Sequence, residues 1–199
     1  MYLCSVSKNL YIVSGCNGAG KTTASYTILP QILKCKEFVN ADEIARGLSP
    51  FQPKKVAIEA GKIMLQRVDE LLKNNENFAF ETTLASKSHK NTILKAKNKG
   101  YNVTLIFFWL QTVELAKRRV RERALRGGHN IETDVIERRY FAGIRNLFDI
   151  YIPISEVVFI FDNSEGIYEL IAEKKNDSDF SIINNLKYNK LQQNYDRKR

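Results

Sequence analysis

The stretch Tyr11–Thr23, YIVSGCNGAGKTT, decides the fold of this chain. An apolar run typical of a buried strand breaks into a glycine-rich loop, which ends in Lys21 and Thr22 and opens a helical stretch. Gly15–Thr22 fits the pattern G-x-x-x-x-G-K-[ST]. In such a loop the backbone N–H groups converge on phosphate oxygens, and the N-terminus of the following helix adds positive potential. The sequence therefore predicts a loop that binds the triphosphate of a nucleotide, and we expect ATP.

The phosphate loop supplies most of the residues predicted to bind the nucleotide. Within it we expect Lys21 to reach the terminal phosphates and the hydroxyl of Thr22 to bind Mg²⁺, so ATP and Mg²⁺ are the predicted cofactors. The nucleotide-binding set in the loop consists of Gly15, Cys16, Asn17, Gly18, Ala19, Gly20, Lys21, Thr22 and Thr23.

Further apolar runs alternate with helical stretches along the chain. The runs are near-continuously apolar, as in strands buried on both faces of a parallel sheet. The pattern predicts an α/β fold, a P-loop NTPase-type parallel sheet sandwiched by helices. Strands are expected at 10–15, 37–42, 77–83, 101–110 and 156–164, and helices at 21–34, 53–74, 86–99, 112–125 and 131–149.

We expect one kinase-sized domain over residues 1–176, with an arginine-rich lid at about 112–149. Residues 177–199 are polar and basic, and this composition predicts a loosely packed, flexible extension. No apolar run reaches the length of a membrane span, and the N-terminal residues lack the pattern of a signal peptide. We therefore expect a cytoplasmic protein without a membrane partner.

Polar side chains follow two of the predicted strands. Asn40 and Asp42 leave the second strand, and Glu81, Thr82 and Thr83 leave the third. Second substrates bind beyond the carboxyl ends of such strands, so these five residues are the predicted acceptor side. A carboxylate there can accept the proton of an attacking hydroxyl or hold magnesium through water. The alternatives are that Asp42 only caps a helix and that Glu81 only forms a salt bridge.

The segment LAKRRVRERALRGGHNIETDVIERRY gathers arginines around the pair Gly127-Gly128. At helical spacing Arg119, Arg123 and Arg126 share one face, which can close over the triphosphate as a lid. We expect Arg118 and Arg121 to be solvated and His129 to be a turn residue rather than a base.

The net charge of +9 raises the question of a nucleic-acid partner. The excess of basic residues lies in two segments, 117–145 and 187–199, and few aromatic side chains are interleaved with it. Stacking aromatics normally accompany strand binding, so we do not expect a nucleic-acid partner.

Taken together, GCNGAGKTT, FVNADEIARGL, FETTLAS, the lid sequence and FIFDNS resemble the zeta toxin family of P-loop kinases, particularly its compact chromosomal branch. The resemblance implies transfer of the γ-phosphate of ATP to a hydroxyl of a small metabolite, such as the UDP-amino sugar UDP-N-acetylglucosamine. It implies that Asp42 is the general base, that Glu81 and Thr83 line the acceptor pocket, and that Arg123 and Arg138 stabilise the transferred phosphoryl group. It also implies an antitoxin protein as partner.

Two other functions use the same phosphate loop. One is a nucleoside or polynucleotide kinase whose basic tail grips a strand, and the other is a regulatory ATPase. Asp42 favours a kinase, because a kinase needs a base for the acceptor hydroxyl whereas a switch ATPase needs a positioned water. The residues alone leave the acceptor open.

Overall fold

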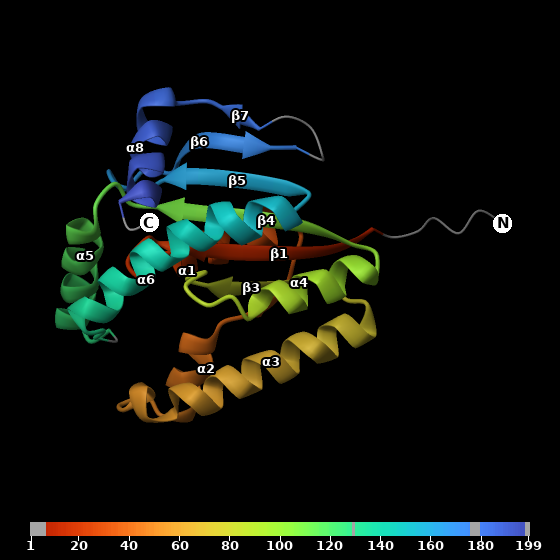
Figure 1. Cartoon of the computed structure of the whole chain (residues 1–199). Coiled ribbons are helices and arrows are strands. Elements are labelled where there is room, and N and C mark those ends of the chain that lie inside the picture. Colours follow the sequence, from red (N-terminus) through yellow and green to blue (C-terminus); the bar gives the residue numbers. More distant parts are fainter. Residues whose placement is uncertain (1–6, 129, 176–179, 198–199) are drawn as a thin grey trace.

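The structure is a computed structural model, and it describes residues 7–128, 130–175 and 180–197. Its seven-stranded sheet has the order β2-β3-β1-β4-β5-β6-β7. The first five strands in the chain run parallel, and β6 and β7 are antiparallel additions. Figure 1 shows helices packed against this sheet, so the predicted α/β fold is confirmed. The strands are β1 (Lys8–Gly15), β2 (Glu37–Val39), β3 (Phe78–Thr82), β4 (Tyr101–Trp109), β5 (Val157–Asp162), β6 (Glu169–Lys174) and β7 (Ser181–Ile182).

The helices alternate with the parallel strands, as right-handed crossover connections require. The parallel strands point toward the side on which α5 lies (Figure 1), so their carboxyl ends and the loops that follow them form one edge of the molecule. The helices are α1 (Lys21–Thr27), α2 (Ala41–Leu48), α3 (Ala57–Asn74), α4 (His89–Asn98), α5 (Val113–Leu125), α6 (Thr133–Asn146), α7 (Ile152–Ile154) and α8 (Asn185–Asp196). A π-helical turn at Ile28–Ile32 extends α1, and another at Leu147–Tyr151 extends α6.

The centre of the sheet is apolar on both faces, which explains the continuous apolar runs. Ile12 of β1 lies beside Phe80 of β3 and Leu105 of β4, and all three side chains are fully buried. Burying such side chains contributes about 1.5–3 kcal/mol each to folding. The central strands therefore form a rigid support for the loops at their carboxyl ends.

The expectation of a loosely packed tail is wrong for residues 180–197. Ser181–Ile182 adds the edge strand β7, and α8 packs on the domain with Leu191 fully buried and Tyr188 almost so. Asn184 caps α8 by accepting a hydrogen bond from the backbone N–H of Lys187. Two buried apolar side chains three residues apart are enough to dock a helix whose other positions are polar. The boundary at residue 176 stays a prediction.

Within the described residues, no helix is both long enough and apolar enough to cross a bilayer.

Candidate active site at the carboxyl ends of the strands

The predicted phosphate loop lies between β1 and α1, in the strand–loop–helix setting that its sequence pattern requires. Gly18 and Gly20 have φ of 81° and 85°, in the left-handed region that favours glycine. A Cβ atom on Gly20 would lie 2.6 Å from Nδ2 of Asn163, and one on Gly15 would lie 2.1 Å from the carbonyl oxygen of Phe108. Glycine is therefore needed both for the turn and for close packing against β4 and the end of β5.

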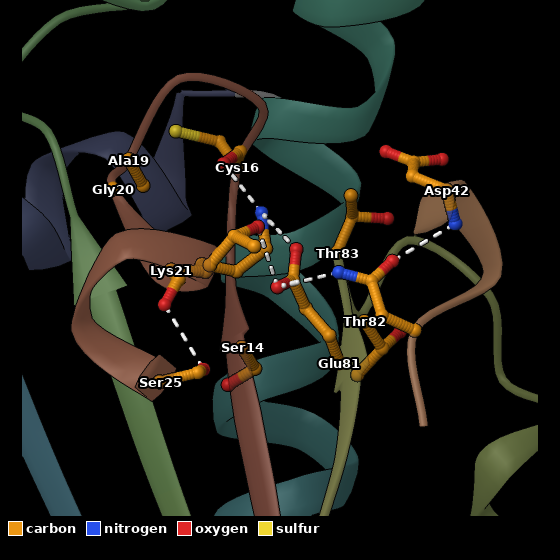
Figure 2. Close-up of polar contacts among 12 residues, drawn as sticks. Ser14, Cys16, Ala19, Gly20, Lys21, Ser25, Asp42, Glu81, Thr82 and Thr83 are labelled. Atoms are coloured by element: carbon orange, nitrogen blue, oxygen red, sulfur yellow. Dashed lines mark hydrogen bonds and ion pairs between the residues drawn. The ribbon is translucent and has the colours of Figure 1, made fainter. Parts of the chain in front are cut away.

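Lys21 and Glu81 point toward one another across the site (Figure 2). Nζ of Lys21 lies 3.6 Å from Oε1 of Glu81 and donates a hydrogen bond of 3.0 Å to the carbonyl oxygen of Cys16. The hydroxyl of Thr22 and the amide of Asn40 both donate to Oε2 of Glu81, at 2.8 Å and 3.0 Å. Glu81 thus joins the phosphate loop to the acceptor side. Its salt bridge with Lys21 lies within the site, so the salt bridge does not argue against a role of Glu81 in binding or catalysis.

The polar groups around Thr22 fit a magnesium ion. Because the hydroxyl proton of Thr22 is directed to Glu81, the lone pairs of its oxygen remain available to a cation. Among the described residues there is no cluster of three metal-ligating side chains. A single hydroxyl and a nearby carboxylate suit Mg²⁺, which keeps several waters and takes further ligands from substrate phosphates.

Asn40, and not Asp42, caps α2. Its Oδ1 accepts hydrogen bonds from the backbone N–H groups of Asp42 and Glu43, at 2.8 Å and 3.4 Å. The alternative that Asp42 serves as the cap is therefore excluded. The side chain of Asp42 is exposed in the first turn of α2, where the positive end of the helix stabilises a carboxylate.

A cavity of about 400 Å³ opens beside Lys21 and Asp42. It contains all five residues predicted for the acceptor side, so the structure brings that set together. Its far wall comes from α3, whose contribution sequence reasoning missed. The lining residues are Asn17, Lys21, Asn40, Ala41, Asp42, Ile58, Gly61, Lys62, Met64, Leu65, Glu81, Thr82, Thr83, Ser88, His89 and Arg139.

His89 is one of the residues that sequence reasoning missed. It starts α4 and lines the cavity, and its ring lies against Phe80 with the ring centroids 5.0 Å apart. Burial lowers the pKa of His89 below its ordinary value, so the imidazole is neutral at pH 7. The surrounding sequence SKSHKN is polar throughout and gave no signal that this histidine would be enclosed.

A second, smaller cavity of about 80 Å³ shares Ala41 and Asp42 with the first. Thr22, Asp42 and Arg123 all line it, although they come from three different elements. Arg46 of α2 also lines it and was not predicted; its Nη1 lies 3.1 Å from Oε1 of Glu43. The predicted magnesium ligand Thr22, the predicted general base Asp42 and the predicted phosphoryl-stabilising Arg123 therefore line one small cavity, about the size of a phosphoryl group.

The segment predicted to form a lid contains two helices, α5 and α6, with the glycine pair between them. Arg119, Arg123 and Arg126 line one cavity of about 500 Å³ together with Arg46, as expected for residues on one helical face. Arg119 also donates a hydrogen bond of 3.0 Å to the carbonyl oxygen of Ser164. Arg118 and Arg121 are exposed, whereas His129 lies outside the described residues.

The pair Arg138-Arg139 is split between two environments, and the role of Arg138 stays a prediction. Arg138 is exposed, whereas Arg139 is half-buried and lines the cavity beside Asp42. Neighbouring residues of a helix point about 100° apart, so the two side chains meet different surroundings. Sequence alone did not fix the rotation of α6.

The turn that follows β5 supports the phosphate loop from behind. Nδ2 of Asn163 donates to the carbonyl oxygen of Ala19 at 2.9 Å, and the hydroxyl of Tyr168 donates to the carbonyl oxygen of Gly20 at 3.2 Å.

Cys16 lies within the phosphate loop. Burial raises the pKa of its thiol to about 11, so this cysteine stays protonated and is no nucleophile.

Solved structures with this fold include toxins and metabolite kinases. A chain of the AvrRxo1-ORF1:AvrRxo1-ORF2 complex superposes with a TM-score of 0.75 at 17% identity, covering 94% of this chain and 64% of that one. A chain of the PezAT chromosomal toxin–antitoxin system of Streptococcus pneumoniae gives 0.66 at 20% identity, covering 96% and 85%. A gluconokinase from Sinorhizobium meliloti gives 0.51 at 11% identity, covering 77% and 81%. These likenesses show a P-loop kinase fold, and this chain spans less than two thirds of the AvrRxo1 chain.

Comparison of sequences identifies one family among the proteins that share this fold. An uncharacterized protein from Haemophilus influenzae is 29% identical over 126 residues, which are 63% of this chain and 88% of that protein. The family model for zeta toxins matches residues 4–175, which include the phosphate loop, the acceptor side and the lid. The chain therefore belongs to the zeta toxin family.

Proposed function

We propose that this chain is an ATP-dependent kinase that transfers the γ-phosphoryl group to a hydroxyl of a small metabolite. The observation that carries the proposal is that Asp42 lines two cavities: the small one together with Thr22 and Arg123, and the 400 Å³ one together with the predicted acceptor residues. A donor phosphate on the loop and an acceptor in the larger cavity would meet at Asp42.

In the proposed reaction, the carboxylate of Asp42 accepts the proton of the acceptor hydroxyl while its oxygen bonds to the γ-phosphorus. The bond from that phosphorus to the β,γ-bridging oxygen breaks, and ADP leaves with the electron pair. Lys21 and the lid arginine Arg123 would neutralise charge on the transferring group. Mg²⁺, when bound, would neutralise phosphate charge, with Thr22 as ligand and Glu81 oriented toward its waters.

The acceptor cavity is suited to a molecule with both polar and apolar parts. Lys62 and Arg139 provide cationic groups, His89 a neutral donor and acceptor, and Ile58, Met64 and Leu65 an apolar wall. Family membership makes a UDP-amino sugar such as UDP-N-acetylglucosamine the first acceptor to test. We also propose an antitoxin partner and a cytoplasmic location, as family membership suggests.

The structure gives less support to the two alternative functions, a polynucleotide kinase and a regulatory ATPase. A polynucleotide kinase would use the basic tail to hold a strand, but Lys187 of that tail is engaged in two ion pairs. A regulatory ATPase gives no role to a cavity that adjoins Asp42.

The test is an assay of ADP release with and without candidate acceptors: UDP-N-acetylglucosamine, other UDP-sugars, nucleosides and oligonucleotides. We expect one small-molecule class to stimulate ADP release in wild-type protein and not in Asp42→Asn, with a phosphorylated product visible by mass spectrometry. ADP release that no acceptor stimulates, and that Asp42→Asn leaves unchanged, would show the regulatory ATPase instead.

A further inference from the structure

The C-terminal helix places a lysine on a buried carboxylate at the end of β5. Nζ of Lys187 lies 2.8 Å from Oδ2 of Asp162 and 2.6 Å from Oε2 of Glu169. The side chain of Asp162 is 1% exposed, whereas that of Glu169 is 43% exposed. A buried carboxylate is costly unless it is paired and hydrogen-bonded, so the contact with Asp162 is the one that matters.

Both members of the inner pair are charged over the physiological pH range. Burial acts to raise the pKa of Asp162, but hydrogen bonds from Lys187, Ser164 and Gln111 outweigh burial and hold that pKa below its ordinary value. Hydrogen bonds to Asp162 and Glu169 raise the pKa of Lys187. The link between α8 and β5 is thus a permanent ion pair.

Asp162 also holds Ser164, two residues further along the chain. Its Oδ1 accepts hydrogen bonds from the backbone N–H and the hydroxyl of Ser164, at 2.9 Å and 2.5 Å. The hydroxyl oxygen of Ser164 in turn accepts a hydrogen bond of 2.9 Å from the backbone N–H of Gln111. The carboxylate therefore sets the path of the turn after β5.

That turn contacts both walls of the nucleotide site. The carbonyl oxygen of Ser164 accepts a hydrogen bond of 3.0 Å from Nη2 of the lid residue Arg119. The amide of Asn163 donates to the carbonyl oxygen of Ala19 in the phosphate loop at 2.9 Å. A chain of short polar contacts thus runs from α8 through Asp162 and Ser164 to Arg119, and the adjacent Asn163 holds the phosphate loop.

We propose that Lys187 is a positioning residue for ATP, which acts through Asp162 on the turn after β5. In that turn Ser164 holds Arg119 and Asn163 holds the phosphate loop. The inference rests on the proposed function, in that the loop must bind ATP. The zeta toxin match ends at residue 175, so Lys187 follows the matched region while it holds a carboxylate inside it. Helix α8 would thereby contribute to ATP binding through Lys187.

The test measures ATP·Mg²⁺ binding by calorimetry without any acceptor, together with KM for ATP and kcat once an acceptor is known. Lys187→Met keeps the aliphatic stem and removes the charge. We expect it to raise the Kd for ATP by about tenfold and to raise KM more than it lowers kcat. Lys187→Arg should recover most of the affinity, because it restores a cation beside Asp162.

Two control variants separate positioning from stability. Leu191→Ala removes a fully buried side chain of the same helix, so it should lower the melting temperature and leave the Kd for ATP within about twofold of wild type. Glu169→Gln removes only the exposed partner of Lys187 and should also leave the Kd unchanged. If Lys187→Met does not fold, Ser164→Ala breaks the same chain of contacts and should weaken ATP binding severalfold.

Unchanged affinity in Lys187→Met, or in Ser164→Ala should that variant stand in for it, would overturn the inference and leave the kinase proposal intact. Affinity that falls in Lys187→Met and Leu191→Ala in proportion to lost stability would overturn it too. A wild-type chain that binds no ATP would overturn the proposed function and this inference together.

Discussion

The hydroxyl of Thr22 donates a hydrogen bond of 2.8 Å to Oε2 of Glu81, and this contact links the phosphate loop to the neighbouring strand β3. The same oxygen accepts a hydrogen bond from Asn40, which caps α2 and so places Asp42. The carboxylate of Glu81 therefore connects the phosphate loop, where ATP is expected, to the residues expected to bind the acceptor.

Changing Glu81 to glutamine tests this arrangement. The amide keeps the shape but loses the charge that orients Thr22 and the waters of a bound magnesium ion. We expect turnover to fall about 10- to 100-fold at low Mg²⁺ and to recover in part as Mg²⁺ is raised. A magnesium titration of activity checks this, with Glu37→Gln, a carboxylate paired to Arg67, as control. A loss that Mg²⁺ does not relieve would assign Glu81 to the acceptor alone.

Asp42→Asn should abolish transfer to the acceptor and largely spare ATP binding, because the change removes a base and keeps the shape. Asn40, not Asp42, caps α2, so the melting temperature should stay close to that of wild type. Product formation and ATP affinity are measured in parallel, with Glu59→Gln, at an exposed position of α3, as the matched control. Normal transfer in Asp42→Asn would remove it as the base.

Arg123 and Arg121 lie on the same helix but differ in their surroundings. Both side chains are exposed, but Arg123 lines the cavity with Thr22 and Asp42, and Arg121 lines neither that cavity nor the acceptor cavity. We expect Arg123→Met to lower kcat by about 100-fold, with a smaller change in KM for ATP, because the guanidinium meets charge that develops during transfer. Arg121→Met should have little effect. Equal small losses at both positions would make the arginines a solvated face.

His89 should make stability depend on pH. Burial lowers its folded pKa, whereas in the unfolded chain the imidazole has a pKa of about 6.5. As the pH falls below that value the unfolded chain binds the proton first, so the free energy of unfolding decreases until the pH passes the folded pKa. His89→Gln should flatten this decrease. Melting temperatures at pH 7.5 and 5.5 are compared in both proteins, and an identical pH dependence would contradict the assignment.

Removing residues 180–199 should lower the stability of the protein. Deletion takes away the buried side chains of α8, uncovers the core beneath them and leaves Asp162 without Lys187. We expect a melting temperature lower by several degrees and reduced solubility. Thermal melts of the truncated and full-length chains provide the measurement, and equal melting temperatures would show that the tail contributes nothing.

The phosphate loop and the five parallel strands could be predicted because local signals specify them. Gly15, Gly20 and Lys21 have a fixed spacing, and strands buried on both faces leave continuous apolar runs. The acceptor side followed from topology, since Asn40 and Glu81 end adjacent strands of the sheet.

Other features depend on tertiary contacts that no short window contains. The rotation of α6, which favours Arg139 over Arg138, is set by packing on the sheet. Helix α8 was missed because Tyr188 and Leu191 are its only buried apolar residues, along a segment that is otherwise largely polar. His89 becomes part of the site only through the ring of Phe80, which belongs to another element.

The two edges of the sheet are unusually small. The outermost strands, β2 and β7, are three and two residues long, and α8 follows β7 directly. A protein that bound by adding a strand would gain few backbone hydrogen bonds at either edge. Any antitoxin of this chain is therefore expected to recognise it through side chains, and its specificity should be open to change by point substitutions at the surface.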